Sequence, residues 1–377
     1  MMRRVHKFTV MLDADDVLLS CIGQAVEWAN RDYNFNPPLA IDEVTQWDPS
    51  GKRTDVIFRY FKREDFFEAQ QPLEGAREFV RKLSKIAEVF LVTAIPAEFT
   101  GIRFKQLKRF FKEIPEKNFI PAYRKDVVQA DFLLDDGAHN ILASNATYPV
   151  LLRRPWNQHM TGILAVNNYD EFLNLFTVIC NSYSPKQPSF RSPTILALVA
   201  PSASGKTAIA EELIKNPGIE KPKSTTTRDP RLGEDPNSYH FVSDEEFERL
   251  KKNNELAEFS TYANAQYGSE ITSINEILDH GRHCVIPIDI SGAMALKMQY
   301  RTVLIYIKRN KEDIYKSMIQ RINDGMMAEK DFLNRMLAID AEKKNEQLCD
   351  YVVDNDDTIE SAADSILEVL RLKQKEE

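Results

Sequence analysis

Short apolar runs recur along the chain, and the first three of them end near polar or acidic residues. Continuous apolar runs are typical of strands that are buried on both faces, and their alternation with amphipathic helical segments predicts parallel sheets covered by helices. An α/β fold class follows for both halves of the chain. The predicted strands are FTVML, VFLVTA, DFLLDD and YPVLLR in the first half, and ILALVA, HCVIPIDI and RTVLIYI in the second.

A proline- and serine-rich stretch separates the two halves. The sequence NSYSPKQPSFRSPT, from Asn181 to Thr194, contains three prolines and four serines and has no helical periodicity. Such composition is typical of a linker. We therefore predict two domains, 1–182 and 194–377, joined by a linker over 183–193.

Residues 18–72 break the alternation of strands and helices because they are rich in aromatic side chains. A segment of this size after the first strand predicts a small helical cap inserted into the first domain. Most of its aromatic residues are expected to form the core of the cap. Phe66 and Phe67, which lie just before the chain returns to the main domain, are the candidates for stacking on a base.

Composition describes an ordinary globular protein. Of 377 residues, 43% are hydrophobic and 28% are charged, so each half can bury a core. The formal net charge of −8 argues against binding to a nucleic-acid polymer, which requires an excess of Lys and Arg, but it does not argue against small nucleotides. The four cysteines form no C-x-x-C pair, which suits a reducing compartment.

The N-terminal sequence MMRRVHKFTVML begins basic and then becomes apolar, as a signal peptide does. Its apolar part is short, Asp13 interrupts it, and no small-residue cleavage site follows. No apolar run is long enough to span a membrane. We therefore expect a cytoplasmic protein with no membrane partner.

The motif DADD follows the first predicted strand. Asp13 and Asp15 are two positions apart, so their side chains point the same way at the end of the strand, where ligands bind in parallel sheets. Two carboxylates on one side repel each other unless a cation lies between them or one is protonated. Mg²⁺ with oxygen ligands meets this need. One carboxylate could then attack phosphorus while the other moves the proton of the leaving group.

Three later strand ends could complete such a site. Thr93 ends VFLVT and could donate a hydrogen bond to a phosphoryl oxygen, and Lys125 in AYRKDVV could neutralise developing charge. Asp135 and Asp136 end DFLLDD and could complete the metal site. A lone acidic cluster is usually a solvated loop, but four signals at strand ends in this order favour a phosphate-transfer site.

These motifs resemble those of the haloacid dehalogenase superfamily and, within it, the 5′(3′)-deoxyribonucleotidases. The resemblance covers roughly the first 170 residues and implies a Rossmann-like core in which Asp13 is the nucleophile and Asp15 the general acid/base. Those nucleotidases usually have Gly where this chain has Asp16, so an extra carboxylate is expected beside the entrance. The resemblance also implies that Thr93 and Lys125 hold the phosphate, and that Asp13, Asp15, Asp135 and Asp136 support Mg²⁺. Its motifs are DADDVL, FFEAQQPLEGAREFVRKL, LVTAIP, YRKD and LLDDGAHN.

A second phosphate-binding signal lies in APSASGKT, between the strand ILALV and the helical segment TAIAEELI. Strand, loop and helix in this order are what a P-loop requires, because backbone N–H groups and the helix N-terminus bind phosphate oxygens. Lys206 would reach the β- and γ-phosphates of ATP, and Thr207 would hold Mg²⁺. The predicted ATP-binding residues of the loop are Ser202, Ala203, Ser204, Gly205, Lys206 and Thr207.

From residue 194 to about 371 the chain resembles guanylate kinase, through STTTRDPRLGEDPNSYHFVSDEEF, NNELAEFSTYANAQYGS, CVIPIDISGA and YVVDND. The resemblance implies a P-loop, parallel-sheet kinase domain. Two departures stand out: Pro287 replaces a family acid, leaving Asp289 as the acid that contacts the acceptor, and the lid segment RINDGMMAEKD lacks the arginine of its glycine-rich turn. The resemblance implies that the acceptor's monophosphate is bound by Arg228, Arg231, Tyr239 and Tyr267, and that its base is read by Ser224, Glu258 and Ser269. It also implies that Arg321 and Arg335 are catalytic and that Asn355 lies near the adenine of ATP.

The side chain of Glu258 limits which base can bind. A carboxylate only accepts hydrogen bonds, and guanine offers it the N1–H and the 2-amino group together. Adenine presents a lone pair at N1 and would be repelled, whereas uracil-type bases offer one N–H. Glu258 therefore excludes adenine more firmly than it requires guanine.

The sequence thus predicts a bifunctional enzyme that acts on nucleoside monophosphates. One domain would be a Mg²⁺-dependent 5′-(deoxy)nucleotidase that forms an aspartyl-phosphate. The other would transfer phosphate from ATP, also with Mg²⁺, to a (deoxy)nucleoside monophosphate, with GMP or dGMP favoured. Because both activities on one nucleotide would waste ATP, we expect the two sites to prefer different bases.

Three alternatives stay open. The second half could be a non-catalytic binding or dimerisation module, since guanylate-kinase-like scaffolds exist, although those typically lose the P-loop. It could instead phosphorylate a modified, phage-type pyrimidine deoxynucleotide. Finally, a guanylate kinase could be fused to a general phosphatase for damaged or excess nucleotides. A homodimer is left open by the sequence.

Overall fold

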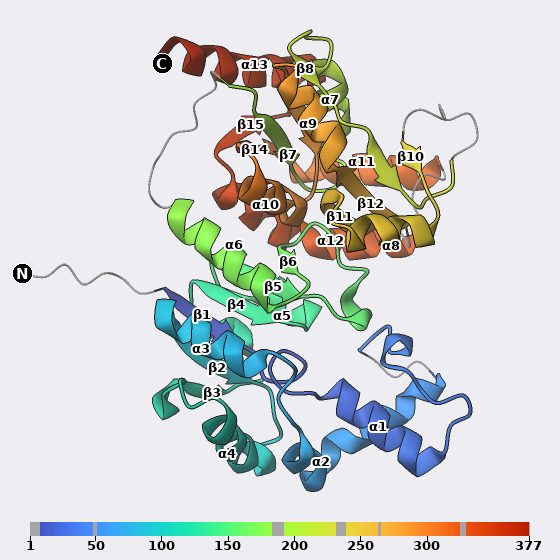
Figure 1. The fold of residues 1–377 in the computed structure, drawn as a ribbon, viewed down its shortest axis with the longest axis vertical. Helices are drawn as coiled ribbons and strands as arrows, with labels where there is room; N and C mark the ends of the chain where they lie inside the picture. The colour runs from blue at the N-terminus through green and yellow to red at the C-terminus, as the bar shows by residue number, and fades with distance from the viewer. Residues whose placement is uncertain are drawn as a thin grey trace, which may run out of the picture. The chain divides into compact units, whose positions relative to one another are not determined.

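A six-stranded parallel sheet in the order β3-β2-β1-β4-β5-β6 forms the centre of the first half of the chain (Figure 1). The computed structural model describes residues 8–47, 51–182, 192–230, 239–262, 265–324 and 329–376. The direction of strand addition reverses between β1 and β4, so the carboxyl end of β1 lies at the topological switch point where ligands bind in such sheets. The strands are β1 (Thr9–Leu12), β2 (Glu88–Thr93), β3 (Phe119–Pro121), β4 (Phe132–Asp135), β5 (Tyr148–Leu152) and β6 (Ala165–Val166).

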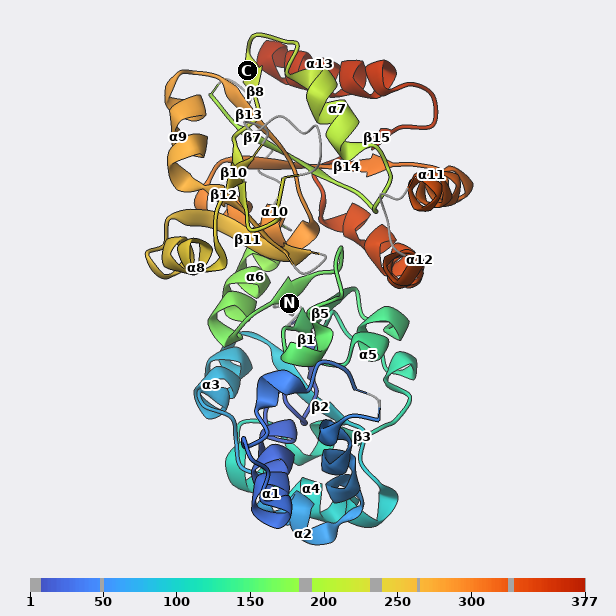
Figure 2. The same cartoon turned by 90° about the vertical axis from the view of Figure 1, so that its right-hand side faces the viewer.

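Helices cover this sheet because its central strands are mostly apolar. Every residue of β4 and β5 is buried. Phe79 of α3 stacks on Tyr169 of α6 with ring centroids 4.5 Å apart, so these helices pack together, and α3 and α5 lie on opposite sides of the sheet (Figure 2). The helices are α1 (Ile22–Tyr33), α2 (Glu64–Ala69), α3 (Ala76–Ile86), α4 (Thr100–Phe110), α5 (Ala138–Ala143) and α6 (Tyr169–Ser182), with 3₁₀ turns at Ile41–Glu43, Arg53–Lys62, Ala97–Phe99, Glu116–Asn118, Lys125–Val127 and Pro155–Asn157.

The predicted cap over 18–72 is helical in its described part and has its own core. Helix α1, the long 3₁₀ helix Arg53–Lys62 and α2 enclose a cluster of buried aromatic and aliphatic side chains. Phe66 is fully buried and Phe67 is 4% exposed within this cluster. The prediction that these two rings stack on a base is therefore wrong, because packing inside the cap leaves neither ring face available.

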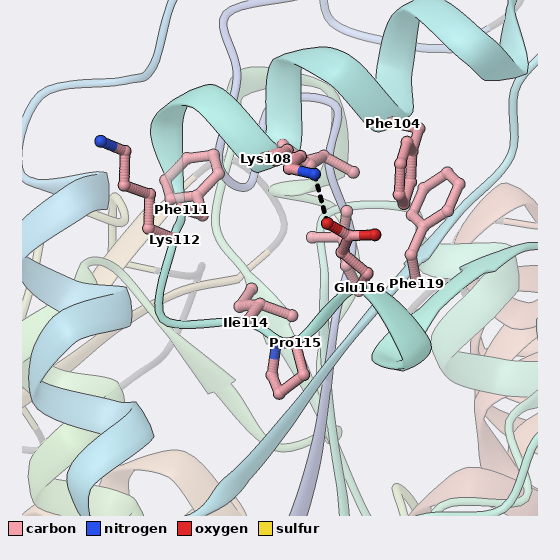
Figure 3. A pocket seen from close by; sticks show the side chains of 10 residues that line it. Phe104, Lys108, Phe111, Lys112, Ile114, Pro115, Glu116 and Phe119 are labelled. Atoms are coloured by element: carbon pink, nitrogen blue, oxygen red, sulfur yellow. Dashed lines mark ion pairs between the residues drawn. The ribbon is translucent and has the colours of Figure 1, made fainter.

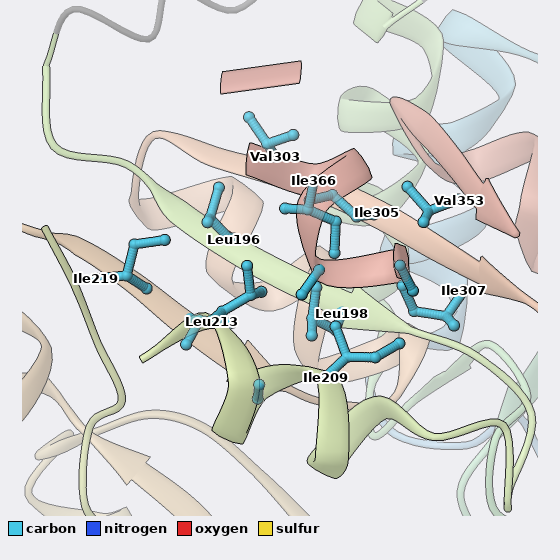
Figure 4. Close-up of a cluster of buried hydrophobic side chains, with 14 of the residues drawn as sticks. Leu196, Leu198, Ile209, Leu213, Ile219, Val303, Ile305, Ile307, Val353 and Ile366 are labelled. Carbon is cyan, nitrogen blue, oxygen red and sulfur yellow. The ribbon is translucent and has the colours of Figure 1, made fainter. Parts of the chain in front are cut away.

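The second half contains a five-stranded parallel sheet in the order β15-β14-β7-β13-β8. Strand β7 lies in its middle, and Leu196 and Leu198 on one face pack against Ile209 and Leu213 of α7 and Ile366 of α13 (Figure 4). The elements are β7 (Ile195–Val199), β8 (Ile219–Glu220), β13 (His283–Pro287), β14 (Thr302–Lys308), β15 (Tyr351–Asp354), α7 (Lys206–Leu213), α8 (Asp244–Lys252), α9 (Ile271–Asp279), α10 (Ile290–Gln299), α11 (Lys311–Asn323), α12 (Glu329–Lys343), the 3₁₀ helix Lys344–Leu348 and α13 (Ile359–Glu376).

A third, four-stranded sheet of order β10-β9-β12-β11 was not predicted. It is mixed: β12 pairs antiparallel with both β9 and β11, whereas β10 pairs parallel with β9. Its strands carry polar and aromatic residues instead of continuous apolar runs, because only part of each strand faces a core. They are β9 (Ser224–Thr226), β10 (His240–Phe241), β11 (Leu256–Tyr262) and β12 (Ala265–Glu270).

Contacts divide the chain into two units, one of residues 1–158 and 164–173 and the other of 159–163 and 174–377. The predicted linker, 183–193, falls almost entirely outside the described residues. The predicted domain limits at 182 and 194 therefore stay a prediction. Across the part of the chain that the structure describes, no helix combines the length and the apolar character needed to cross a membrane.

Candidate active sites

The carboxyl ends of β1, β2 and β4 bring together the residues predicted for the first site. Asp13 follows β1, Thr93 ends β2 and Asp135 ends β4. Lys125 joins them: its Nζ lies 2.8 Å from Oδ1 of Asp13 and 2.7 Å from Oδ2 of Asp135, and the side chain is 2% exposed. Burial alone would lower the pKa of Lys125, but the two carboxylates outweigh it and raise that pKa, so the lysine is charged.

Three carboxylates here fit a divalent cation. Asp13, Asp135 and Asp136 each offer an oxygen within 4.8 Å of the others, and all three side chains are buried. Burial, together with the neighbouring carboxylates, raises the pKa of Asp13 to about 7, although Lys125 opposes this, and raises the pKa of Asp136 well above its usual value. One lysine cannot balance three carboxylates, so this donor set suits a hard cation with oxygen ligands.

The hydroxyl of Thr93 is available for a phosphoryl oxygen. Its side chain is fully buried, and among the described residues its Oγ1 has no hydrogen-bond partner. A buried hydroxyl without a partner costs free energy unless a ligand satisfies it. Thr93 ends β2, next to the strand that carries Asp13, so it is placed to serve a ligand at the same sheet edge.

The carboxylate of Asp15 is held apart from this cluster. Both its oxygens accept from Nη2 of Arg103, at 2.7 and 2.9 Å, and Oδ1 also accepts from Nε2 of Gln70 at 3.2 Å. Asp15 is not part of the group of carboxylates whose oxygens lie within 4.8 Å of one another, so its role as a metal ligand stays a prediction. Asp15 stays a candidate for proton transfer.

Asp16 does not stand at an entrance, contrary to the prediction. It is 4% exposed, and its carboxylate accepts hydrogen bonds from the backbone N–H groups of Cys21 and Ile22 at the start of α1. Its φ of 52° lies in the left-handed region, which favours Gly and tolerates Asp or Asn. This backbone requirement accounts for the Gly usual at this position, and helix capping gives Asp16 a structural role.

Replacing Asp16 by Ala is expected to lower the free energy of unfolding of the first unit by about 2 kcal/mol, since about 1 kcal/mol comes from the lost cap and about 1 from an alanine at positive φ. Urea unfolding followed by circular dichroism measures this. D16G should lose only the capping part, and D16N should stay close to the wild type because it keeps an acceptor oxygen. Equal instability of D16A and D16G would show that the backbone conformation contributes nothing.

The loop between β7 and α7 has P-loop form. Gly205 has φ +92°, and a Cβ there would meet Nδ2 of Asn355 at 2.6 Å, so only glycine fits. Ala203 also has positive φ, 64°. Lys206 begins α7 and donates to the carbonyl oxygen of Ala200. Burial lowers the pKa of Lys206, which makes an anionic ligand the natural partner for this ammonium group.

Three side chains from distant segments donate hydrogen bonds to the loop. Asn355 donates to the carbonyl of Ser204 at 2.8 Å, Arg335 donates to Oγ of Ser202, and Arg309 donates to the carbonyl of Ala203 at 2.9 Å. The predicted residues Asn355 and Arg335 are thus brought to the loop. Oγ of Ser204 is buried and has no hydrogen-bond partner among the described atoms, which leaves a donor inside the loop.

Glu342 lies near Lys206 but was not among the site residues predicted from the sequence. This residue of α12 is 5% exposed, and burial raises the pKa of its carboxyl to about 7 although Lys206 opposes this. It lies seven positions after Arg335, which is two helical turns on the same face, and this spacing was the available signal. Arg309, on the turn after β14, had no such pattern.

The remaining predicted residues of the kinase half are less enclosed. Thr207 and Arg321 are exposed, and Arg321 acts on Lys206 through its charge. Arg231 lies outside the described residues.

The mixed sheet brings together several residues that were predicted to bind the acceptor. The guanidinium of Arg228 lies over the ring of Tyr239 at 5.4 Å, and Tyr239 meets Tyr267 edge to face at 6.3 Å. Three residues distant in sequence therefore form one polar, aromatic cluster. A guanidinium beside two phenol groups can bind a phosphate monoester.

Glu258 and Ser269 pair across β11 and β12, and Oγ of Ser269 donates to Oε1 of Glu258 at 2.7 Å. Ser224 pairs with Ser269 on the adjoining strand, so the three predicted base-reading residues form one row. Burial, with a smaller effect of Asp289, raises the pKa of Glu258 to about 7. Asp289 itself caps α10, accepting from the N–H of Gly292 at 2.8 Å.

A separate cavity of about 310 Å³ lies beside α4, between Phe104 and Leu107 of the helix, Phe111 just after it, and Phe119 on β3 (Figure 3). An ion pair between Lys108 and Glu116 crosses it. None of the predicted site residues lines this cavity.

Two family models match the chain, "Guanylate kinase" over residues 192–373 and "5' nucleotidase, deoxy (Pyrimidine), cytosolic type C protein" over residues 7–182. Guanylate kinase of Chlamydia abortus is 32% identical over 179 residues, 46% of this chain and 86% of the relative. Guanylate kinase of Clostridium tetani is 32% identical over 165 residues, 43% and 78% of the respective chains. A crystal structure of guanylate kinase from Anaplasma phagocytophilum shares 29% identity over 49% of this chain and 87% of that one, with a TM-score of 0.39.

Proposed function

Because this chain belongs to the guanylate kinase family through its C-terminal half, and its N-terminal half matches the deoxy 5′-nucleotidase family model, we propose that one protein hydrolyses a pyrimidine deoxynucleoside monophosphate and phosphorylates a guanine nucleotide. Both families are enzymes, so the chain combines a phosphatase with a nucleoside monophosphate kinase. The observation that supports the proposal is that Lys125 contacts Asp13 and Asp135 at the sheet edge of the first half, whereas the loop before Lys206 in the second half has the backbone form of a P-loop.

In the nucleotidase half, Asp13 is the nucleophile. Its carboxylate oxygen attacks phosphorus, the ester oxygen leaves with a proton from Asp15, and water then attacks the aspartyl-phosphate after giving a proton back to Asp15. Lys125 and the hydroxyl of Thr93 contact the phosphoryl oxygens. Mg²⁺, which Asp13, Asp135 and Asp136 would hold, supplies further neutralisation of phosphoryl charge.

In the kinase half, positioning and charge neutralisation replace covalent chemistry. The loop Ser202–Thr207 and Lys206 bind the phosphates of ATP, Thr207 would hold Mg²⁺, and Arg335 with Arg321 stabilises the transferred phosphoryl group. Arg228, Tyr239 and Tyr267 hold the acceptor's phosphate. Glu258, Ser269 and Ser224 read its base, and Asp289 stands beside Glu258.

The two sites are expected to prefer different bases. The matching nucleotidase model is described as acting on pyrimidine deoxynucleotides, whereas the relatives of the kinase half are named guanylate kinases. Different preferences also avoid a futile cycle in which one site consumes the substrate that the other phosphorylates. The protein would then remodel a nucleotide pool, draining one deoxynucleotide while raising a guanine nucleotide.

A panel of all common ribo- and deoxyribonucleoside monophosphates with Mg²⁺ tests the proposal. Phosphate release and diphosphate formation are followed separately, with and without ATP. Release confined to pyrimidine deoxynucleotides and diphosphate confined to guanine nucleotides are expected. The same preference at both sites would refute the pool-remodelling idea, and phosphate release without any diphosphate would favour a non-catalytic second half.

Replacing Glu258 by Gln is expected to lower kcat/KM for GMP by about 10- to 150-fold, because a charge-assisted hydrogen bond is worth about 1.5–3 kcal/mol and an amide places a donor against a donor of guanine. IMP lacks the 2-amino group, so its kcat/KM should fall less. The ratio of kcat/KM for GMP to kcat/KM for IMP should therefore decrease. Glu255→Gln, at a half-exposed residue three positions earlier, is the matched control. Equal losses for GMP and IMP would contradict base reading by Glu258.

A further inference from the structure

Arg103 is a fully buried cation that no predicted role uses. It lies in the first half of α4, and its side chain has no exposed surface. Its Nη2 donates to both oxygens of Asp15, and its Nη1 donates to Oε1 of Gln70 at 2.8 Å. Such a buried arginine is expensive to place without partners, so these contacts fix its position strongly.

Gln70 closes a triangle with these two residues. It is fully buried, accepts from Arg103 through Oε1 and donates to Oδ1 of Asp15 through Nε2 at 3.2 Å. Gln70 lies in the short connection between α2, the last helix of the cap, and α3. The triangle therefore joins a residue beside the nucleophile, the return from the cap, and a helix of the main domain.

The surroundings keep the triangle rigid. The guanidinium of Arg103 lies over the ring of Phe67 at 5.5 Å, and Gln106, one turn further along α4, donates to the carbonyl of Phe67. Helix α4 and the cap's last helix are thus joined at the level of Asp15. A carboxylate that accepts three hydrogen bonds from two donor nitrogens has little rotational freedom, which is the condition for efficient proton transfer at a fixed distance.

We propose that Arg103 and Gln70 are positioning residues that orient the Asp15 carboxyl for proton transfer to the leaving oxygen of the nucleotide. The inference rests on the proposed nucleotidase function and deepens it. Neither residue contacts Asp13, Lys125 or Thr93 through any hydrogen bond found among the described residues, so their effect on catalysis should pass through Asp15 alone.

A leaving-group comparison separates this role from a merely structural one. Hydrolysis of dTMP breaks a P–O bond, and the departing alkoxide needs the proton of Asp15. In the analogue of dTMP with a bridging 5′ sulfur, the P–S bond breaks and a thiolate leaves; its pKa of roughly 8.5 lets it depart without a proton. The base, the sugar and the phosphoryl group are the same, and kcat/KM for both substrates reports only the steps up to departure of the leaving group.

The experiment measures kcat/KM for dTMP and for its sulfur analogue in the wild type, Arg103→Met and Gln70→Leu. For Arg103→Met, dTMP hydrolysis is expected to fall about 10²-fold, at the low end of what general acid catalysis supplies, while hydrolysis of the sulfur analogue falls less than about 3-fold. Gln70→Leu should show the same pattern with a smaller loss. Arg109→Met, an exposed arginine of the same helix, is the matched control and should leave both values unchanged.

Equal losses for the two substrates would overturn the proposal and leave Arg103 a structural residue. Circular dichroism and urea unfolding check each variant, and if Arg103→Met does not fold, Gln70→Leu decides the question by the same ratio. Failure of the underlying function looks different, because the wild type itself would then hydrolyse neither substrate.

Discussion

Phosphate release is expected to fall by at least about 10⁴-fold when Asp13 is replaced by Asn, since removal of a catalytic nucleophile costs factors of this order or more. Diphosphate formation by the kinase half should be unchanged. The physical reason is that the amide is a poor nucleophile towards phosphorus. The substitution also removes one of the three carboxylates that lie within 4.8 Å of one another, and one of the two acids that Lys125 contacts.

Both activities are measured on the purified full chain, with Asp170→Asn as the control because the Asp170 side chain is 83% exposed. The control should retain full phosphate release. Removal of Mg²⁺ by a chelator should abolish phosphate release from the wild type, and added Mg²⁺ should restore it. Residual hydrolysis by Asp13→Asn within tenfold of the wild type would show that another group attacks phosphorus.

Diphosphate formation is expected to fall by about 10³-fold when Lys206 is replaced by Ala, in the range that removal of a charge-stabilising group of a phosphoryl-transfer site produces. Phosphate release should be unchanged. Lys206 is the half-buried cation at the start of α7, and its desolvation lowers its pKa, so its charge is most stable when phosphate oxygens surround it. Loss of this charge leaves the transferred phosphoryl group without its nearest neutralising partner.

The control for Lys206→Ala is Lys215→Ala, because the Lys215 side chain lies just beyond the same helix and is 69% exposed. ATP binding by calorimetry separates the two readings of the second half. A wild type that binds ATP and forms diphosphate is a kinase. A wild type that does neither is a binding module, despite the intact loop.

Much of the fold and of the first site could be predicted because the relevant signals are local. An apolar run followed by Asp13, or one ending at Thr93 or Asp135, marks a buried strand and its carboxyl end, and parallel strands bring such ends to one sheet edge. The sequence signal for the loop that precedes Lys206 is also local, because the strand, the glycine and the helix follow one another directly along the chain. Membership of the guanylate kinase family, the match of the first half to the nucleotidase family model and the α/β class are confirmed; the roles of individual site residues and the domain limits stay predictions.

Features that depend on contacts between distant segments could not be predicted from the sequence. The mixed sheet carries no continuous apolar runs, so its strands do not stand out from loops. Glu342 and Arg103 are charged helical residues like many others, and only the packing around them shows that they are buried. Phe66 and Phe67 are aromatic and could in principle stack on a base, but whether a ring faces a ligand or a core depends on neighbours distant in sequence.

The sequence by itself determined which chemical groups each half possesses and at which strand ends they lie, because strand periodicity and loop chemistry act over a few residues. Only the tertiary structure decided what each group contacts. Asp13, Asp15 and Asp16 stand within four positions, yet Asp13 meets Lys125, Asp15 meets Arg103 and Gln70, and Asp16 caps α1. Since the partners of a charged side chain set its orientation, and since most of these partners come from distant segments, three neighbouring aspartates acquire three different surroundings.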